Sequence, residues 1–391
     1  MQESDSANTP FRDAPPFDLA ADAHRLRVYA AGADRREALF ALIDGAERTL
    51  DVCFYIFATD ATGQAMRDAL TRAAQRGVAV RLMLDCFGAE AGEAFFAEMR
   101  AAGGQFLSFS PKWSQRYLIR NHQKMVIADG ERALFGGFNI EDSYFAPPEE
   151  NGWNDLAIAL QGPAVAGLAA WFDVLFRWAS EERPRFLRLR RQVRGWEWRD
   201  GTARWLVGGP SRGLSSWARC VREDLRTGRR LDMIMAYFSP SAAALRRVGR
   251  IARLGDTRLV MAAKSDNNAT LGATRSLYDY LLRKGAAVYE FQPCKLHTKL
   301  IVIDDTVYLG SANFDVRSLY LNLELMFRIE DAGVAARMRQ FVNGHIGASE
   351  PITTALHQQR ATLWNRIRWN LGWLLVTVVD YTVTRRLNLG L

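Results

Sequence analysis

The stretch NHQKMVIADGERALFGGFN, residues 121–139, decides the fold, because the chain contains it twice. The second copy is LHTKLIVIDDTVYLGSAN, residues 296–313. Each copy reads as a His-x-Lys, an apolar strand, a short turn and a second strand that returns to a Gly-x-x-Asn loop. One histidine alone can be a structural residue, but His122 and His297 stand in matched positions of a repeat. We therefore expect the two copies to share one site.

The repeat extends upstream of both motifs. Residues 49–57 and 230–238 both read as buried strands, and each is followed by a helical stretch and a further strand that ends in an acid, Asp85 or Asp266. The two acids are 181 residues apart. Strands that alternate with helices are typical of parallel sheets covered by helices. We predict an α/β fold of two α/β/α repeats, related by a pseudo-two-fold axis, with the site at their interface.

This organisation predicts five segments along the 391 residues. They are a disordered N-terminal lead (1–21), a first repeat (22–180), a basic Arg- and Trp-rich linker (181–202), a second repeat (203–350) and a C-terminal amphipathic helix (351–391). The linker suits either a contact with a phosphate-rich surface or a solvated connection, and its composition does not decide between them.

The C-terminal segment combines a short apolar run with aromatic and basic residues. Its uninterrupted apolar stretch, residues 371–379, is too short to cross a bilayer, which needs about 20 apolar residues. Tryptophan, tyrosine and arginine flank this stretch, and that pattern is typical of a helix in the membrane interface. The alternative is a helix docked on the protein's own core, and the sequence allows both.

The composition narrows the class of partner. The chain carries 51 Lys and Arg against 43 Asp and Glu, a net charge of +8, which indicates a polyanion such as nucleic acid or an anionic membrane surface. Hydrophobic residues at 49% exclude disorder as the dominant state. The four cysteines form no C-x-x-C pair, so we expect reduced thiols in a cytosolic protein and no zinc site.

The paired His-x-Lys motifs suit the cleavage of a phosphodiester. One histidine can attack phosphorus to form a phosphohistidine, while the other protonates the leaving alkoxide and then acts as base for the acceptor. Lys124 and Lys299 supply positive charge to the phosphoryl group, and Asn139 and Asn313 supply amide donors. A lysine beside each histidine would repel a cation, so we expect neither a metal nor another cofactor.

The pattern HxKxxxxD followed by GSxN or GGxN resembles the signature of the phospholipase D superfamily, and the resemblance covers residues 22–350. It implies His122 as the nucleophile and His297 as the general acid and base. Asp129 and Asp304 complete the motifs and belong to the candidate catalytic set. We rank them below the His and Lys, because we expect them to stabilise the turn after each strand.

The resemblance also assigns supporting residues. Ser311 joins the phosphate-binding group, and Gly137 replaces it in the first copy, which removes one hydroxyl. The hairpin turn is one residue shorter in the second copy, which should not move His297. Superfamily members orient each histidine through a carboxylate downstream of the motif, and here Asp155 and Glu324 are the candidates.

The local sequence around residues 136–140, 153–155 and 313–318 resembles bacterial cardiolipin synthases, although the N-terminal transmembrane pair of the longer members is absent. The resemblance implies transfer of a phosphatidyl group from a phosphatidylglycerol-like anionic lipid to a lipid alcohol. It also implies a peripheral protein on the cytoplasmic side of the cell membrane, and we do not expect nucleic acid as the partner. The alternatives are a hydrolytic phospholipase D that releases phosphatidic acid, a nuclease, and an inactive scaffold.

Overall fold

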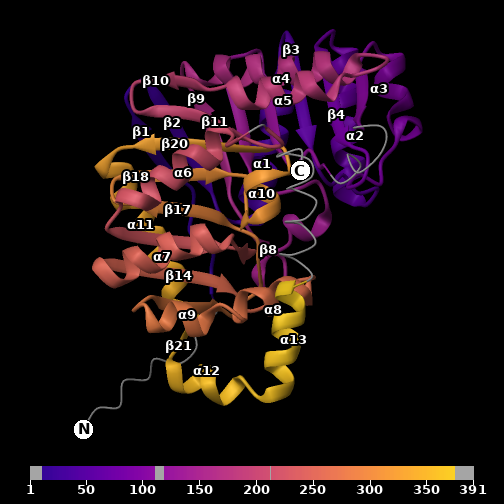
Figure 1. Cartoon of the computed structure of the whole chain (residues 1–391). Helices are drawn as coiled ribbons and strands as arrows, with labels where there is room; N and C mark the ends of the chain where they lie inside the picture. Colours follow the sequence, from indigo (N-terminus) through magenta and orange to yellow (C-terminus); the bar gives the residue numbers. More distant parts are fainter. Residues whose placement is uncertain (1–10, 111–118, 212, 375–391) are drawn as a thin grey trace.

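The computed structural model describes residues 11–110, 119–211 and 213–374 as two sheets with their covering helices (Figure 1). From edge to edge, the first sheet contains β1 (Phe17–Ala21), β2 (His24–Tyr29), β9 (Ala157–Gln161), β7 (Arg132–Gly136), β6 (Met125–Ala128), β3 (Thr49–Phe54), β4 (Ala79–Asp85) and β5 (Gln105–Phe109).

The second sheet repeats this order strand for strand. It contains β10 (Trp198–Asp200), β11 (Ala203–Gly208), β20 (Glu324–Glu330), β18 (Thr306–Gly310), β17 (Lys299–Ile303), β12 (Arg230–Met235), β14 (Asp256–Ala262), β15 (Ala287–Phe291) and β21 (Ser349–Ile352). Among the strands of the described residues, only β21 has no counterpart in the first sheet. The matching order confirms the predicted two-repeat α/β fold.

Both sheets are mixed rather than parallel throughout. The strands β3, β4 and β5 are parallel, as are β12, β14 and β15, because helices connect them. The strands that carry the motifs pair antiparallel, since β6 and β7 are joined by a tight hairpin in which Asp129 and Gly130 both have positive φ. The corresponding turn between β17 and β18 is one residue shorter, as the spacing predicts.

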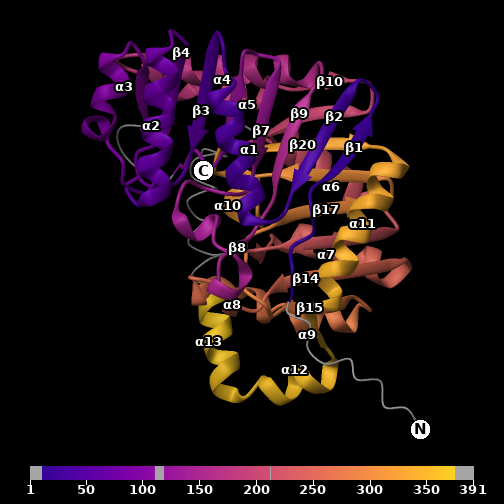
Figure 2. The ribbon, with the colours of Figure 1, turned by 180° about the vertical axis from the view of Figure 1, so that it is seen from behind.

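Helices cover the outer face of each sheet. The first sheet is covered by α1 (Gly32–Asp44), α2 (Ala61–Gln75) and α3 (Ala97–Ala101), and the second by α6 (Ser216–Thr227), α7 (Ala242–Leu254) and α9 (Tyr278–Arg283) (Figure 2). The inner faces enclose one shared core together with α4 (Ala164–Ser180), α5 (Phe186–Gly195) and α11 (Ala332–Gly347).

Aromatic side chains join the two sheets at the centre of the shared core. The ring of Phe135 in β7 lies 4.8 Å from that of Trp205 in β11, and Trp205 lies 4.5 Å from Phe327 in β20. All three side chains are buried. Because these residues come from different repeats, the packing of the core fixes how the two repeats sit against each other.

The ends of the predicted segments differ from expectation. Residues 17–21, expected in the disordered lead, form β1 and pair with β2. The segment expected as a linker contains α5, which buries Phe186, Leu189 and Val193, and it ends in β10, the counterpart of β1. Alternation of buried and exposed residues in β1 is the signal that identifies it as an edge strand.

The C-terminal segment continues after β21 as α12 (Thr354–Arg360) and α13 (Leu363–Trp373). Helix α13 packs on α8 (Asn268–Arg275), with Trp369 buried, and Gly272 and Gly372 allow the close approach. Residues 375–391 of the predicted C-terminal helix lie outside the described residues. Within the described parts of the chain, every helix is too short or too polar to cross a membrane.

The inter-sheet core predicts a large loss of stability on truncation. We expect Phe135→Ala to lower the free energy of unfolding by about 3–5 kcal/mol, because it leaves a cavity between the sheets. Leu254→Ala, at a side chain that is 55% exposed, is the matched control and should change it by less than about 1 kcal/mol. Denaturant unfolding measures both, and equal effects of the two substitutions would contradict this packing.

Candidate active site

The two motifs meet because each repeat provides backbone partners for the other. Strand β8 (Trp153–Asn154) of the first repeat pairs with β16 (Lys295–Leu296) of the second. The backbone N–H of His297 donates to the Asn154 carbonyl at 2.8 Å, and that of His122 donates to the Leu323 carbonyl at 2.9 Å. Each histidine is therefore anchored to the segment that follows the motif in the opposite repeat.

The orienting carboxylates are exchanged between the repeats. His122 Nδ1 lies 3.0 Å from Glu324 Oε2, and His297 Nδ1 lies 2.6 Å from Asp155 Oδ2. Each acid thus follows one motif in the sequence but contacts the histidine of the other. With Nδ1 bound to a carboxylate, Nε2 of each imidazole is available for a reacting group.

Both motif lysines are buried beside the histidines. Lys124 Nζ donates to the His122 carbonyl oxygen at 2.5 Å, and Lys299 Nζ donates to that of His297. Burial lowers the pKa of Lys124 to about 7 and that of Lys299 to about 8. Burial and the charges of the lysines also lower the pKa of His122 and of His297, so both imidazoles are neutral.

The two orienting acids differ electrostatically. Burial raises the pKa of Glu324 to about 8, and its Oε2 also accepts from Ser311 Oγ at 2.5 Å. Burial opposes ionisation of Asp155 as well, but the positive charge of Lys299, the contact with His297 and the charge of Arg35 lower its pKa overall. Asp155 is consequently the firmly ionised member of the pair.

The loop residues of the two copies are used differently. A side chain at Gly137 would place its Cβ 2.4 Å from Asp155 Oδ1, so the first copy has no room for the hydroxyl that Ser311 provides. Asn139 Nδ2 donates to the Tyr144 hydroxyl at 2.9 Å. Asn313 is buried, and its Oδ1 has no hydrogen-bond partner among the described residues.

Asp129 and Asp304 lie away from this cluster, at the far ends of β6 and β17. Both have positive φ, 59° and 47°. Asp129 accepts from the backbone N–H groups of residues 47–49, and Asp304 accepts from those of residues 229 and 230. Their geometry fits the turn-stabilising role, and neither carboxylate joins the histidines.

Sequence reasoning missed the aromatic residues around the histidines. The Tyr144 hydroxyl lies 3.5 Å from His297 Nε2, and the rings of Tyr144 and Trp153 both lie 5.2 Å from the His297 ring. The ring of Tyr55 lies 5.0 Å from that of His122. Tyr144 ends the short 3-10 helix Asp142–Tyr144, and the matching position of the second repeat is Ser318, so the repeat pattern did not mark the tyrosine. Tyr55 follows a strand that the repeat did identify.

The pKa values of the lysines predict pH-dependent anion binding. Both side chains lose their positive charge as the pH rises through about 7 and about 8. We expect the affinity for sulfate, whose own charge is constant here, to fall about tenfold per pH unit for each lysine that deprotonates. Calorimetry from about pH 6 to 9 measures this. An affinity that stays constant over that range would contradict a site in which these lysines hold the anion.

The comparisons with known proteins agree with this geometry. The family described as "Cardiolipin synthase, PLD-like domain" matches residues 39–176 and 224–346. The major cardiolipin synthase ClsA of Bacillus subtilis is 31% identical over 366 residues, which cover 90% of this chain and 75% of that protein. Cardiolipin synthase A of Pseudomonas entomophila is 29% identical and covers 81% of this chain and 67% of that protein.

A solved structure supports the fold independently. The phosphatidylserine synthase of Haemophilus influenzae superposes with a TM-score of 0.74 over 95% of this chain and 96% of that chain, at 14% identity. At that identity the likeness concerns the fold alone. The family match covers both repeats, including both His-x-Lys motifs. The chain therefore belongs to the phospholipase D-like cardiolipin synthase family.

Proposed function

We propose that the protein is a cardiolipin-synthase-like phosphatidyltransferase that moves a phosphatidyl group to a lipid alcohol through a covalent phosphohistidine. The observation that carries this proposal is the pair of buried, carboxylate-bound imidazoles flanked by two lysines at the repeat interface. The cardiolipin synthases among its relatives support the lipid substrate. Phosphatidylglycerol-like lipids fit both as donor and as acceptor, because they carry a phosphodiester and a free hydroxyl.

In the first step, His122 Nε2 attacks the phosphorus of the donor lipid. A P–N bond forms, the P–O bond to the head-group alcohol breaks, and His297 gives its proton to the departing alkoxide. His297 is itself neutral. Binding of the phosphodiester anion offsets the charge of the lysines, and the ionised Asp155 stabilises the imidazolium that His297 must form.

The second step reverses these roles. His297 Nε2 takes the proton of the acceptor hydroxyl, the acceptor oxygen attacks phosphorus, and the P–N bond to His122 breaks. Water in place of a lipid alcohol would give phosphatidic acid by the same route. The nature of the acceptor is thus what separates the transferase from a hydrolytic phospholipase D.

Product analysis tests this function. Purified protein incubated with phosphatidylglycerol vesicles should form cardiolipin and glycerol, and His122→Ala should lower the rate at least about 1,000-fold, because the nucleophile is lost. Thin-layer chromatography of the lipids measures both. Phosphatidic acid as the only lipid product would identify a hydrolase, and cleavage of DNA without a lipid product would refute the proposal.

We also propose that α13 attaches the protein peripherally to an anionic bilayer, on the cytoplasmic side of the membrane. Five large apolar side chains of this region are 47% to 78% exposed: Leu363, Trp364, Ile367, Leu371 and Leu374. Elsewhere in the described residues only Phe87, Leu187 and Leu254 are comparably exposed.

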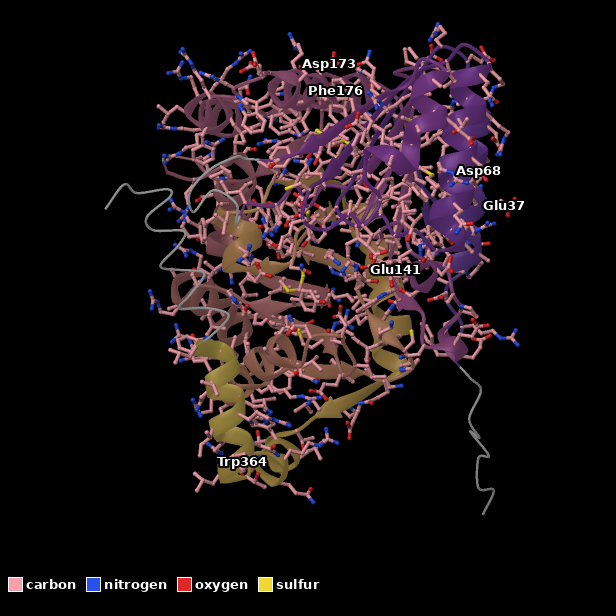
Figure 3. The ribbon with its side chains drawn as sticks, turned by 90° about the vertical axis from the view of Figure 1, so that its right-hand side faces the viewer. Glu37, Asp68, Glu141, Asp173, Phe176 and Trp364 are labelled. Carbon is pink, nitrogen blue, oxygen red and sulfur yellow. The ribbon has the colours of Figure 1, made fainter. Side chains whose placement is uncertain are left out.

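The charge of α13 complements an anionic surface. The helix contains Arg366 and Arg368 and no acidic residue. Its opposite face packs on α8 through Trp369 and Gly372, so the helix is docked on the core and still presents an apolar face. Figure 3 shows Trp364 at the opposite end of the molecule from Asp173 and Phe176 of α4. This arrangement is typical of a helix that lies in the membrane interface.

Vesicle co-sedimentation tests the attachment. Trp364→Asp should weaken binding to phosphatidylglycerol vesicles about tenfold or more, because a charge replaces an exposed aromatic side chain that would insert among the lipids. Leu254→Asp, at an exposed apolar residue of α7, is the matched control and should bind as the wild type does. Equal binding by the Trp364 variant would show that another surface, or the residues beyond 374, makes the contact.

A further inference from the structure

Arg35 is a fully buried cation that the motifs do not account for. It lies on α1, and its guanidinium donates to four backbone carbonyl oxygens. Nη1 donates to Ala30 and, at 2.7 Å, to Asp155, while Nη2 donates to Tyr144 at 2.6 Å and to Trp153 at 2.9 Å. A buried charge is costly, so four directed acceptors indicate a defined role for this side chain.

Three of the four carbonyls that Arg35 binds belong to residues that surround His297. Asp155 binds Nδ1 of His297, and the Tyr144 hydroxyl lies 3.5 Å from Nε2 of the same ring. Trp153 packs against that ring. Arg35 therefore holds both ends of the segment 144–155 in place. It does not contact His297 itself, but it positions the groups that lie at Nδ1 and Nε2 of the His297 imidazole.

The second repeat is built differently here. Counted from the helix N-caps, Ala31 and Ser215, the residue of α6 that corresponds to Arg35 is Arg219. Arg219 is exposed, and its Nη2 donates to Glu197 Oε2 at 3.1 Å. The backbone carbonyl of Glu324, the acid that faces His122, accepts from the neutral side-chain amide of Gln123 at 3.3 Å. The sheets and motifs are duplicated, but in the described residues the arginine at this helix position is buried in the first repeat only.

The positive charge of Arg35 also affects Asp155, the acid that orients His297. Arg35 faces Asp155, Asp13 and Asp34, and together with the charge of Lys299 and the hydrogen bond to His297 it favours the ionised form of Asp155. The corresponding groups around Glu324 are Lys124 and Lys299, and burial outweighs them. An ionised partner stabilises an imidazolium, whereas a protonated one does not.

We propose that Arg35 is the positioning residue that makes the two halves of the site unequal, so that His297 becomes the proton donor and acceptor and His122 the nucleophile. This inference rests on the proposed phosphatidyl transfer. One buried arginine outside both motifs would thus determine which histidine attacks phosphorus and which transfers the proton. Loss of Arg35 should therefore harm proton transfer by His297 much more than the attack by His122.

The dependence on the leaving group tests this inference. With short-chain phosphatidylglycerol, whose alkoxide needs a proton, Arg35→Met should lower kcat about 100-fold and leave KM within about threefold. With a p-nitrophenyl phosphodiester, whose leaving group departs without a proton, the first-turnover burst of nitrophenol reports the attack by His122 before His297 is needed as a base, and its rate should fall less than about fivefold. A purely structural role for Arg35 would slow both substrates equally.

Matched variants keep the test decisive. Arg36→Met, at the exposed neighbouring arginine of α1, should leave both rates unchanged. Arg35→Lys retains the positive charge but cannot donate to all four carbonyls as the guanidinium does. We therefore expect this variant to fold and its kcat to fall about tenfold with phosphatidylglycerol only. If Arg35→Met shows no cooperative unfolding transition, this lysine variant decides the outcome.

The contrary results are distinct. Wild-type rates for Arg35→Lys and Arg35→Met, or an equal loss with both substrates, would overturn the role of Arg35. Activity of His122→Ala with phosphatidylglycerol would instead overturn the proposed function itself.

Discussion

Each motif histidine is held by a carboxylate from the other repeat, and the rest of the site depends on this exchange. Neither half can orient its own imidazole, because Glu324 contacts His122 and Asp155 contacts His297. The pairing requires the two sheets to pack in one arrangement, which the core around Trp205 fixes. The duplicated sequence thereby produces one site instead of two, and the site exists only in the assembled fold.

Burial determines the pKa values of the ionisable groups in this site. Two histidines, two lysines and two acids are buried side by side, and each group shifts the pKa of its neighbours. The buried lysines favour an anion, and a phosphodiester supplies that negative charge. In the proposed reaction, binding of this anion lets His297 accept a proton, so that the substrate itself prepares the site for reaction.

Much of this could be predicted from the sequence, since the matched His-x-Lys motifs and the 181-residue interval identify the repeat, the fold class and the histidines. The exchange of Asp155 and Glu324 could not, because the same spacing fits pairing within a repeat or between repeats. Arg35 was also hidden, since an arginine within the charged run of residues 34–37 looks like a solvated residue. The expectation of disorder at residues 17–21 is wrong, because an isolated edge strand has little sequence signal beyond its alternation.

Direct identification of the covalent intermediate tests the central claim. The His297→Ala variant, given a p-nitrophenyl phosphodiester and quenched in alkali, should carry a phosphoryl-linked adduct on residue 122, because attack needs no general acid there while turnover does. Mass spectrometry of the digested protein locates the adduct. An adduct on His122 is the predicted result. Rapid nitrophenol release without any adduct on His122, or an adduct on another residue, would contradict the account.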